Sequence, residues 1–468
     1  MSRLADRVTA TQDREAARPP PPEPLIVPLP GSVFLPAPAG APPMQVGAAP
    51  PEPLPAAAAV LPVRAQRVIL TPPPGVRRIV PVGLLLPLTG TGAAVGRAML
   101  DAAQMAVFDI GDRDFVLLPR DTRGEPKGAR EAAVSALEGG AKLLLGPLFA
   151  KSVLSVAPVA RAAQVNLVAF SNDRTVAGDN TYLIGLLPGA QIRRVIDYAR
   201  SRGIVRFAAL VPDTSFGRRV VGDMELAVNR SGGTLTQIES YRSDRSDVNA
   251  AVRRLAGYAA RRSALERRRR SLAGAEDEVS RRALGRLEGL DTIGKVGFEA
   301  VLLPESGAAL KAIAPLLPFY DIDIKRVRLL GMAGWSEPGL GREPSLVGAW
   351  FAAPPPAARA ALAEKYKAHY RRALHPLAAL AYDATALAAV LAAGNAAGNA
   401  AGNAAGKKDA PGFGADALAA TNGFSGTAGI FRLNRSGLVE RGLAVLEIEP
   451  DGIRVVSPAP SSFADIGN

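Results

Sequence analysis

The feature that most constrains the fold is a repeated alternation of short apolar runs and helix-like segments between Arg78 and Met332. The runs "RIVPVGLLLP", "DFVLLPRDT", "KLLLGPLF" and "VNLVAFSND" have strand length, and segments such as "GRAMLDAAQMAVFDI" between them place apolar residues at helical spacing. Continuous apolar strands that alternate with helices are typical of a parallel sheet covered on both faces. The pattern therefore predicts an α/β fold.

The same alternation restarts after its first half. The helix-like "GAQIRRVIDYARSRG" opens a second set, whose strands are "RFAALVPD", "TLTQIESY", "FEAVLLPE" and "KRVRLLGM". Two sets in series indicate two doubly wound lobes, and proline interrupts the pattern near Leu187–Pro188 and Ala352–Pro356. The predicted divisions are lobe 1 at 77–187 and 355–435, lobe 2 at 188–354, and a C-terminal part at 436–468 whose strands close the lobes.

Two segments have a composition that does not favour a packed core. Residues 1–76 are rich in proline and alanine, which predicts a disordered, extended tether. The repeat "AAGNAAGNAAGNAAGKK" predicts a flexible surface loop at 393–409 within lobe 1.

An arginine-rich insertion at 258–290 interrupts lobe 2. Its apolar residues Tyr258, Leu265, Leu272 and Val279 recur every seven positions, which predicts a long helix or helical hairpin with one narrow apolar seam. The seam has two interpretations: it packs on its own lobe, as amphipathic helices usually do, or it docks a partner. The candidates for partner binding are Leu265, Arg267, Arg268, Arg269, Arg270 and Leu272.

The composition excludes several kinds of chemistry. The chain has no cysteine, and its two histidines, His369 and His375, have no acidic residue beside them. We therefore expect no disulfide, no metal site, no cofactor and no Ser-His-Asp triad, and the chain is interpreted as a non-catalytic protein. The formal charge is +13, but the basic stretches lack the interleaved aromatic residues of a nucleic-acid surface, so an arginine-biased composition is the simpler explanation.

No transmembrane segment is predicted, because no run reaches the ~18 apolar residues of a membrane span. The first residues contain no apolar stretch typical of a signal peptide and no cysteine for lipidation. Two explanations stay open: the natural start lies upstream, or the protein differs from its relatives in how it is targeted.

A glycine-rich turn, "PLTGTGAAVG", joins the first strand to the first helix. Its spacing G-x-G-x-x-x-G is one residue longer than the dinucleotide fingerprint, and no P-loop lysine follows, so a nucleotide site is not expected. Either Gly90 and Gly92 only permit a tight turn, or the turn also borders a ligand, since ligands bind outside the carboxyl ends of strands in open α/β sheets.

The order of the blocks "GLLLPLTGTGAAVGRAMLDAAQMAV", "LLGPLFAKSV", "NLVAFSND", "VPDTSFGRRV" and "GFSGTAGIFRLNRSG" resembles the type I periplasmic binding proteins of the Leu/Ile/Val class, from about Val80 to Pro458. The insertion and the blocks "LLPFYDID", "LVGAWFAAP" and "LAYDATALA" resemble the bacterial penicillin-binding-protein activators. The resemblance implies a cleft between the lobes and a periplasmic location, with outer-membrane association in the activator branch.

The resemblance also implies where a ligand would bind. In that family, turns at strand ends hold the carboxylate of an amino acid, and an acidic residue of the second lobe holds its ammonium group. Here Ala333 stands at the position of that acid, and a buried ammonium without its partner costs several kcal/mol. We therefore expect an altered amino-acid site. The cleft candidates are Thr89, Gly90, Phe149, Ala150, Lys151, Ser152, Ser171, Asn172, Asp173, Phe216, Ala333, Trp335 and Glu337.

Two functions follow as expectations. The first is an extracytoplasmic regulator that activates a penicillin-binding protein, the peptidoglycan synthase, by contact. The alternative is the substrate-binding subunit of an ABC transporter for amino acids or amides. The altered cleft and the charged insertion favour the first, and the retained strand-end turns favour the second. Whether a small polar ligand fills the cleft stays open.

Overall fold

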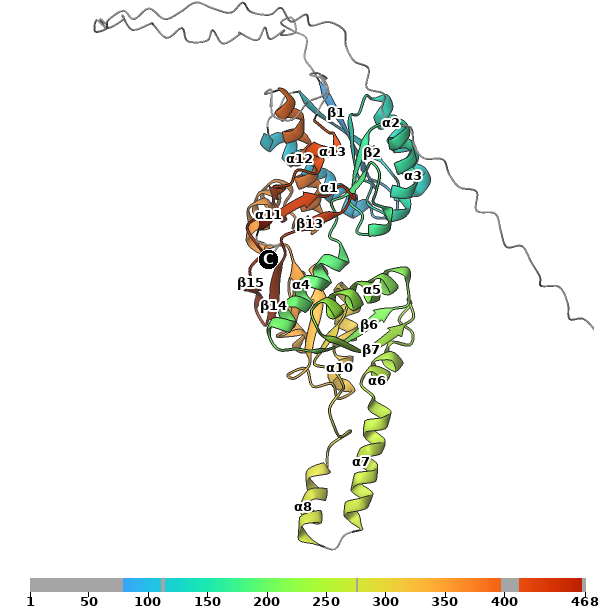
Figure 1. Ribbon diagram of the computed structural model, residues 1–468, viewed down its shortest axis with the longest axis vertical. Helices are drawn as coiled ribbons and strands as arrows, with labels where there is room; N and C mark the ends of the chain where they lie inside the picture. The colour runs from blue at the N-terminus through green and yellow to red at the C-terminus, as the bar shows by residue number, and fades with distance from the viewer. Residues whose placement is uncertain (1–78, 111–113, 275–276, 397–411, 465–468) are drawn as a thin grey trace, which may run out of the picture. The chain divides into compact units, whose positions relative to one another are not determined.

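The computed structural model describes residues 79–110, 114–274, 277–396 and 412–464 (Figure 1). Its two main sheets divide the described chain into two lobes. Lobe 1 is built on five parallel strands in the order β2-β1-β3-β4-β5, and lobe 2 on seven strands in the order β15-β14-β10-β9-β8-β6-β7. Both lobes have the predicted α/β layers, although lobe 2 is mixed, because β14 runs antiparallel to β10 and β15.

Lobe 1 buries both faces of its sheet. Along β1, Leu84 and Leu86 belong to one core with Met99 of α1, whereas Leu85 belongs to the opposite core with α2 and α3, as the alternation of side chains along a strand requires. The strands are β1 (Val80–Leu86), β2 (Phe115–Asp121), β3 (Leu143–Leu145), β4 (Asn166–Ala169) and β5 (Thr181–Leu183). The helices are α1 (Ala93–Ile110), α2 (Pro126–Glu138), α3 (Ala150–Ala162), α11 (Pro356–Tyr370), α12 (Ala378–Ala396) and α13 (Ala415–Leu418).

A small antiparallel sheet of three strands completes lobe 1. This sheet packs Phe431, Leu433 and Val439 into the core that also contains buried residues of α1 and α12. Its strands are β11 (Phe424–Gly426), β12 (Gly429–Leu433) and β13 (Val439–Arg441).

Lobe 2 has the same layered construction. The helices α4 and α5 cover one face of its sheet, and α6, α9 and α10 cover the other. The strands are β6 (Arg206–Pro212), β7 (Thr234–Tyr241), β8 (Ala300–Leu302), β9 (Arg328–Met332), β10 (Trp350–Ala353), β14 (Ala444–Glu449) and β15 (Gly452–Ser457). The helices are α4 (Pro188–Ser201), α5 (Ser215–Arg230), α6 (Val248–Leu255), α7 (Tyr258–Ala273), α8 (Glu278–Leu287), α9 (Gly307–Ile313) and α10 (Leu316–Phe319).

The chain passes between the sheets of the two lobes three times: before α4, between β10 and α11, and between β13 and β14. The first two passages lie at the prolines noted in the sequence. At the third, β13 ends in lobe 1 and β14 begins in lobe 2, so the segment 436–468 contributes to both lobes.

Two sequence expectations concern low-complexity segments. The tether at 1–76 lies outside the described residues, as does the part of the alanine-glycine-asparagine repeat at 397–411. The expected loop at 393–409 is corrected at its start, because α12 continues to Ala396. Alanine is the strongest helix former, and the alanine-rich α12 extends into the first unit of the repeat.

Candidate functional site

The first strand-end turn of lobe 1 is organised by Asp121 at the end of β2. Its carboxylate accepts hydrogen bonds from the backbone N–H groups of Leu88 (2.9 Å), Thr89 (3.2 Å) and Arg123 (2.8 Å), and from the Thr89 hydroxyl (2.5 Å). Partial burial alone would raise the pKa of Asp121, but these hydrogen bonds outweigh it and hold the pKa below its usual value. Thr89, a predicted cleft residue, therefore uses both its N–H and its hydroxyl in hydrogen bonds to Asp121.

The glycines of this turn are required by close packing. Gly90 and Gly92 have φ of 65° and 85°, which favours glycine. A Cβ on Gly92 would lie 2.9 Å from the Phe149 ring, and one on Gly96 would lie 2.0 Å from the Pro87 carbonyl oxygen. The turn is thus a tight junction that brings α1 against the end of β1.

The other lobe 1 candidates lie at the ends of β3 and β4. Ala150 and Lys151 open α3, and Lys151 is exposed. Ser152 is buried, and its hydroxyl has no hydrogen-bond partner within the described part of the chain. Ser171 is buried and its hydroxyl accepts from the N–H of Asp173 at 3.1 Å, which orients the second turn internally.

The lobe 2 candidates are mostly engaged within their own lobe. Phe216 is half-buried in the first turn of α5. Trp335 is fully buried, and its Nε1 donates to the Glu305 carbonyl oxygen at 2.8 Å. Glu337 forms an ion pair with Lys311 at 2.8 Å. The N–H of Ala333, the residue after β9, donates to the side-chain oxygen of Gln191 of α4 at 2.8 Å.

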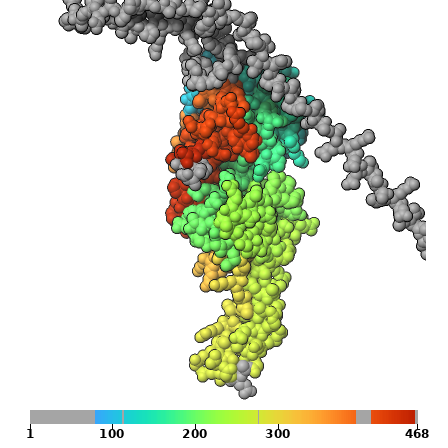
Figure 2. All heavy atoms as spheres, in the orientation of Figure 1, coloured from blue at the N-terminus to red at the C-terminus, as the bar shows by residue number. Residues whose placement is uncertain are grey.

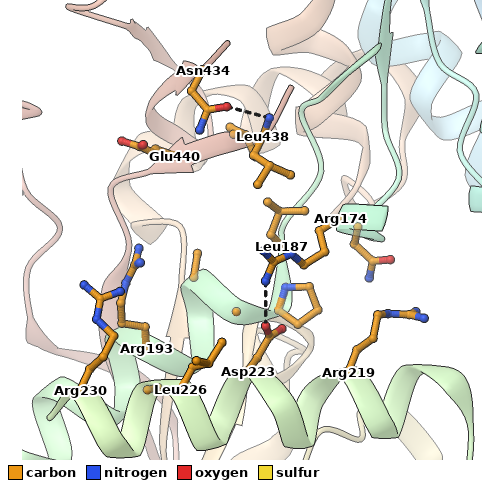
Figure 3. A pocket seen from close by; sticks show the side chains of 16 residues that line it. Arg174, Leu187, Arg193, Arg219, Asp223, Leu226, Arg230, Asn434, Leu438 and Glu440 are labelled. Carbon is orange, nitrogen blue, oxygen red and sulfur yellow. Dashed lines mark hydrogen bonds and ion pairs between the residues drawn. The ribbon is translucent and has the colours of Figure 1, made fainter. Parts of the chain in front are cut away.

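Two cavities of the structure each contain one of the predicted cleft residues. A cavity of about 370 Å³ opens between α4 and α5 of lobe 2 and the η1 turn (Arg174–Val176) and β13 of lobe 1 (Figure 3). Among the thirteen candidates, Asn172 alone lines it, whereas Ala333 lines another, mainly apolar cavity of about 280 Å³. The first cavity is lined by Asn172, Arg174, Leu187, Pro188, Gly189, Ala190, Arg193, Arg219, Asp223, Leu226, Ala227, Arg230, Asn434, Leu438, Val439 and Glu440.

Two ion pairs connect the lobes beside this cavity. Arg174 of lobe 1 lies 3.6 Å from Asp223 of α5, and Arg219 of α5 lies 3.3 Å from Asp173 of lobe 1. Burial raises the pKa of Asp223, and the positive charges of Arg174 and Arg219 oppose that rise. Gly189 leaves room for this carboxyl group, because a Cβ there would lie 3.0 Å from the Asp223 Cγ.

The insertion forms a helical hairpin of α7 and α8 that projects from lobe 2 (Figure 1 and Figure 2). Leu265 and Leu272 of the predicted seam are buried, but Val279 is 77% exposed, so the seven-residue repeat ends at the turn. Arg261 of α7 holds the base of the hairpin to lobe 2, because its Nη1 donates to the Asp321 carbonyl oxygen at 3.1 Å.

The arginines predicted to bind a partner have two different roles in the hairpin. Arg269 donates to the carbonyl oxygen of Leu287, the last residue of α8, and to that of Leu290, and it is half-buried. Arg267, Arg268 and Arg270 are exposed, and none of them forms an ion pair with another described residue. These three therefore remain available at the surface.

Sequence reasoning missed the groups that line the interlobe cavity. Asp223 follows no recognisable motif, and the cavity arginines are four among many in an arginine-rich chain. One weak signal exists: Arg219, Asp223 and Arg230 are spaced by four and seven residues, which places them on one face of α5. Over the described ranges, no cluster of three or more metal-ligating side chains occurs, and none of the helices is both long and apolar enough to span a membrane.

Comparison with curated proteins gives two partial relatives. A segment of 178 residues is 22% identical to an uncharacterized protein, RP748, of Rickettsia prowazekii, and covers 38% of this chain and 47% of that protein. A segment of 180 residues is 26% identical to the penicillin-binding protein activator LpoA of Photobacterium profundum, and covers 38% of this chain and 29% of LpoA. The chain thus spans less than half the length of these relatives.

Solved structures resemble the chain over most of its length. A leucine-binding protein LivK of Thermotoga maritima has a TM-score of 0.54 at 17% identity, with 81% of this chain and 99% of that chain covered. A branched-chain amino acid ABC transporter protein of Rhodospirillum rubrum has a TM-score of 0.60 at 16% identity, with 81% and 100% covered. These similarities confirm the predicted two-lobed fold and carry no ligand assignment at this identity.

The match at the level of a family extends across both lobes. The family model described as "Periplasmic binding protein" matches residues 79–452, which includes the strand-end turns, the interlobe cavity and the hairpin. Both the fold and this match therefore show that the chain belongs to the periplasmic binding protein family.

Proposed function

We propose that this protein is a non-catalytic extracytoplasmic regulator that activates a penicillin-binding protein by direct contact through the α7–α8 hairpin. The observation that carries the proposal is the projecting hairpin with Arg267, Arg268 and Arg270 exposed on α7. The partial match to LpoA, a penicillin-binding protein activator by name, supports the same assignment. Membership of the periplasmic binding protein family implies a location outside the cytoplasm.

The hairpin contacts its partner mainly through charge, because Val279 alone of its four seam residues is exposed. Leu265 and Leu272 are buried in the hairpin, and α8 buries none of its residues. Exposed arginines at the surface of α7 suit an acidic face on the synthase and accelerate encounter in a salt-dependent manner.

Charge reversal at these arginines tests the proposal. The variant R267E/R268E/R270E should keep the melting temperature of the parent, because the three side chains are exposed and form no ion pair with another described residue. It should associate more slowly with a peptidoglycan synthase of the same organism and stimulate it less, most clearly at low salt. Arg269 is left intact because it fastens α8.

A control carries the same change of charge on lobe 1. R130E/K142E/K367E alters three exposed residues that are remote in the fold from the hairpin. It should stimulate the synthase as the parent does. Equal stimulation by both triple variants across salt concentrations would count against contact through the hairpin.

The second candidate function is the solute receptor of an ABC transporter. It is favoured by the interlobe cavity and by the similar solved structures, which are mostly ABC transporter solute-binding proteins. Calorimetry with leucine, isoleucine and valine separates the candidates. We expect no tight binding, because Ala333 supplies no carboxylate. A Kd near 1 μM, about −8 kcal/mol, would favour the receptor.

A further inference from the structure

Two arginines at one end of the interlobe cavity have no ionic partner in the described part of the chain. In Figure 3, Arg193 of α4 and Arg230 of α5 lie at the same end of the cavity. Both are exposed, and among the described residues neither forms an ion pair or a side-chain hydrogen bond. They hold no part of the fold together, which leaves their guanidinium groups free for a ligand.

The acidic groups around the cavity do not neutralise this pair. Asp223 forms an ion pair with Arg174, and Asp173 forms one with Arg219. Glu440 of β13 is held by Arg432 at 2.8 Å. Asp197 remains, one helical turn after Arg193 on α4, and the charges of Arg193, Arg194 and Arg230 all act on it. Arg194 is engaged by Leu443, Ser457 and Pro458, so the two cavity arginines Arg193 and Arg230 face Asp197 alone among the described acids, and this end of the cavity keeps a positive excess.

Apolar side chains line much of the cavity wall between this end and Asp223. It is lined by Leu187 just before α4, Leu226 of α5 and Leu438 just before β13, and Leu226 is 59% exposed. Asp223 and Arg230 are seven residues apart on α5, which corresponds to about 10 Å along the helix axis. This length accommodates a small molecule with an apolar body of several carbon atoms.

We propose that this cavity binds an organic acid, with its carboxylate held by Arg193 and Arg230 and its apolar body against Leu226, Leu187 and Leu438. The planar fork of a guanidinium matches a carboxylate in two parallel hydrogen bonds, and a pair of forks at one end fixes the orientation of the ligand. The site is separate from the amino-acid cleft expected from the sequence, with which it shares only Asn172.

The test titrates the full-length protein with hexanoate and 3-phenylpropanoate, followed by ligand-observed NMR. R193Q/R230Q should bind both acids at least tenfold more weakly than the parent. R130Q/R281Q, which loses the same charge at two exposed arginines outside the cavity, should bind them as the parent does. Hexanamide, the uncharged analogue, should bind more weakly than hexanoate, and added salt should weaken hexanoate binding.

A second variant tests the apolar wall. L226Q should weaken hexanoate binding while leaving the fold intact, since the side chain is mostly exposed. The proposed site is wrong if neither acid binds the parent, or if R193Q/R230Q binds both acids with the affinity of the parent. If inorganic phosphate binds as tightly as hexanoate and L226Q has no effect, the organic-acid assignment is overturned in favour of a bare anion site. Synthase stimulation is measured separately, so the regulator proposal can fail or stand independently.

Discussion

Arg269 of α7 fastens the end of α8: its Nη2 lies 2.6 Å from the carbonyl oxygen of Leu287, the last residue of that helix. The same atom donates to the Leu290 carbonyl oxygen at 3.0 Å. The last carbonyl groups of a helix have no partner within it, and a cation there is favourable. Because α8 buries none of its residues, this contact is a principal restraint on its position.

The first prediction follows from this restraint. R269A should loosen α8, so that amide hydrogen exchange at 278–287 becomes at least several-fold faster, while exchange in the sheet of lobe 2 stays unchanged. R268A removes an exposed arginine beside it and should leave exchange as in the parent. Equal exchange in the two variants would mean that helix packing alone holds α8.

The second prediction concerns the glycine turn at the start of α1. G96A should lower the free energy of unfolding by about 1–3 kcal/mol, because its Cβ would lie 2.0 Å from the Pro87 carbonyl oxygen. G222A, within α5, places its Cβ in open space and should raise stability by about 0.5–1 kcal/mol. Urea denaturation of both variants measures the two effects. A G96A variant with the same free energy of unfolding as the parent would contradict the close-packing explanation.

The fold was predictable because its signals are local and repeated. Apolar runs such as the one at β1 and the glycine stops after helices identify the layers and the two lobes. The sheet of lobe 2 was harder, since β14 and β15 reach it from the end of the chain after a pass through lobe 1. Such distant pairing leaves no periodic pattern in the sequence.

The candidate site was less predictable for a related reason. Family resemblance located the strand-end turns, but it could not show that Asp121 engages Thr89 or that Trp335 is fully buried. The interlobe cavity forms where α4, α5 and β13 pack near one another. Arg193 and Arg230 can be identified as cavity residues only once this packing is known. In a chain with many arginines, composition does not distinguish these two.

The third prediction concerns Asp121, whose pKa is held below its usual value. D121A removes the acceptor of several hydrogen bonds, and it should lower the free energy of unfolding by about 2–3 kcal/mol near neutral pH. A lowered folded-state pKa contributes stability above the unfolded value and loses it as pH falls through the folded value. The difference between parent and D121A should therefore shrink in acid.

Denaturant unfolding over the acid range measures this dependence. T89V removes one of the hydrogen bonds to Asp121 and should produce a smaller loss with the same direction of pH dependence. A pH-independent difference between D121A and the parent would show that the carboxylate charge does not contribute.

The fourth prediction concerns His375, which lies between α11 and α12. Burial lowers the pKa of this histidine, and the nearby charge of Arg359 adds to the effect. Its Nδ1 accepts a hydrogen bond from the Leu377 N–H at 3.2 Å, which requires the unprotonated nitrogen. The neutral form is therefore the one that the folded chain stabilises, and protonation should favour unfolding.

The sign of the pH dependence follows from the lowered pKa. The unfolded chain protonates His375 near its ordinary value of about 6.5, before the folded chain does, so stability should fall as pH drops through and below that value. The slope from one such group cannot exceed about 1.4 kcal/mol per pH unit.

H375Q should reduce the fall in stability with decreasing pH. H369Q removes the other histidine, which is exposed on α11, and should retain that fall. Urea denaturation between about pH 7 and pH 5 measures the three slopes. Identical slopes for the parent and H375Q would exclude His375 as the titrating group.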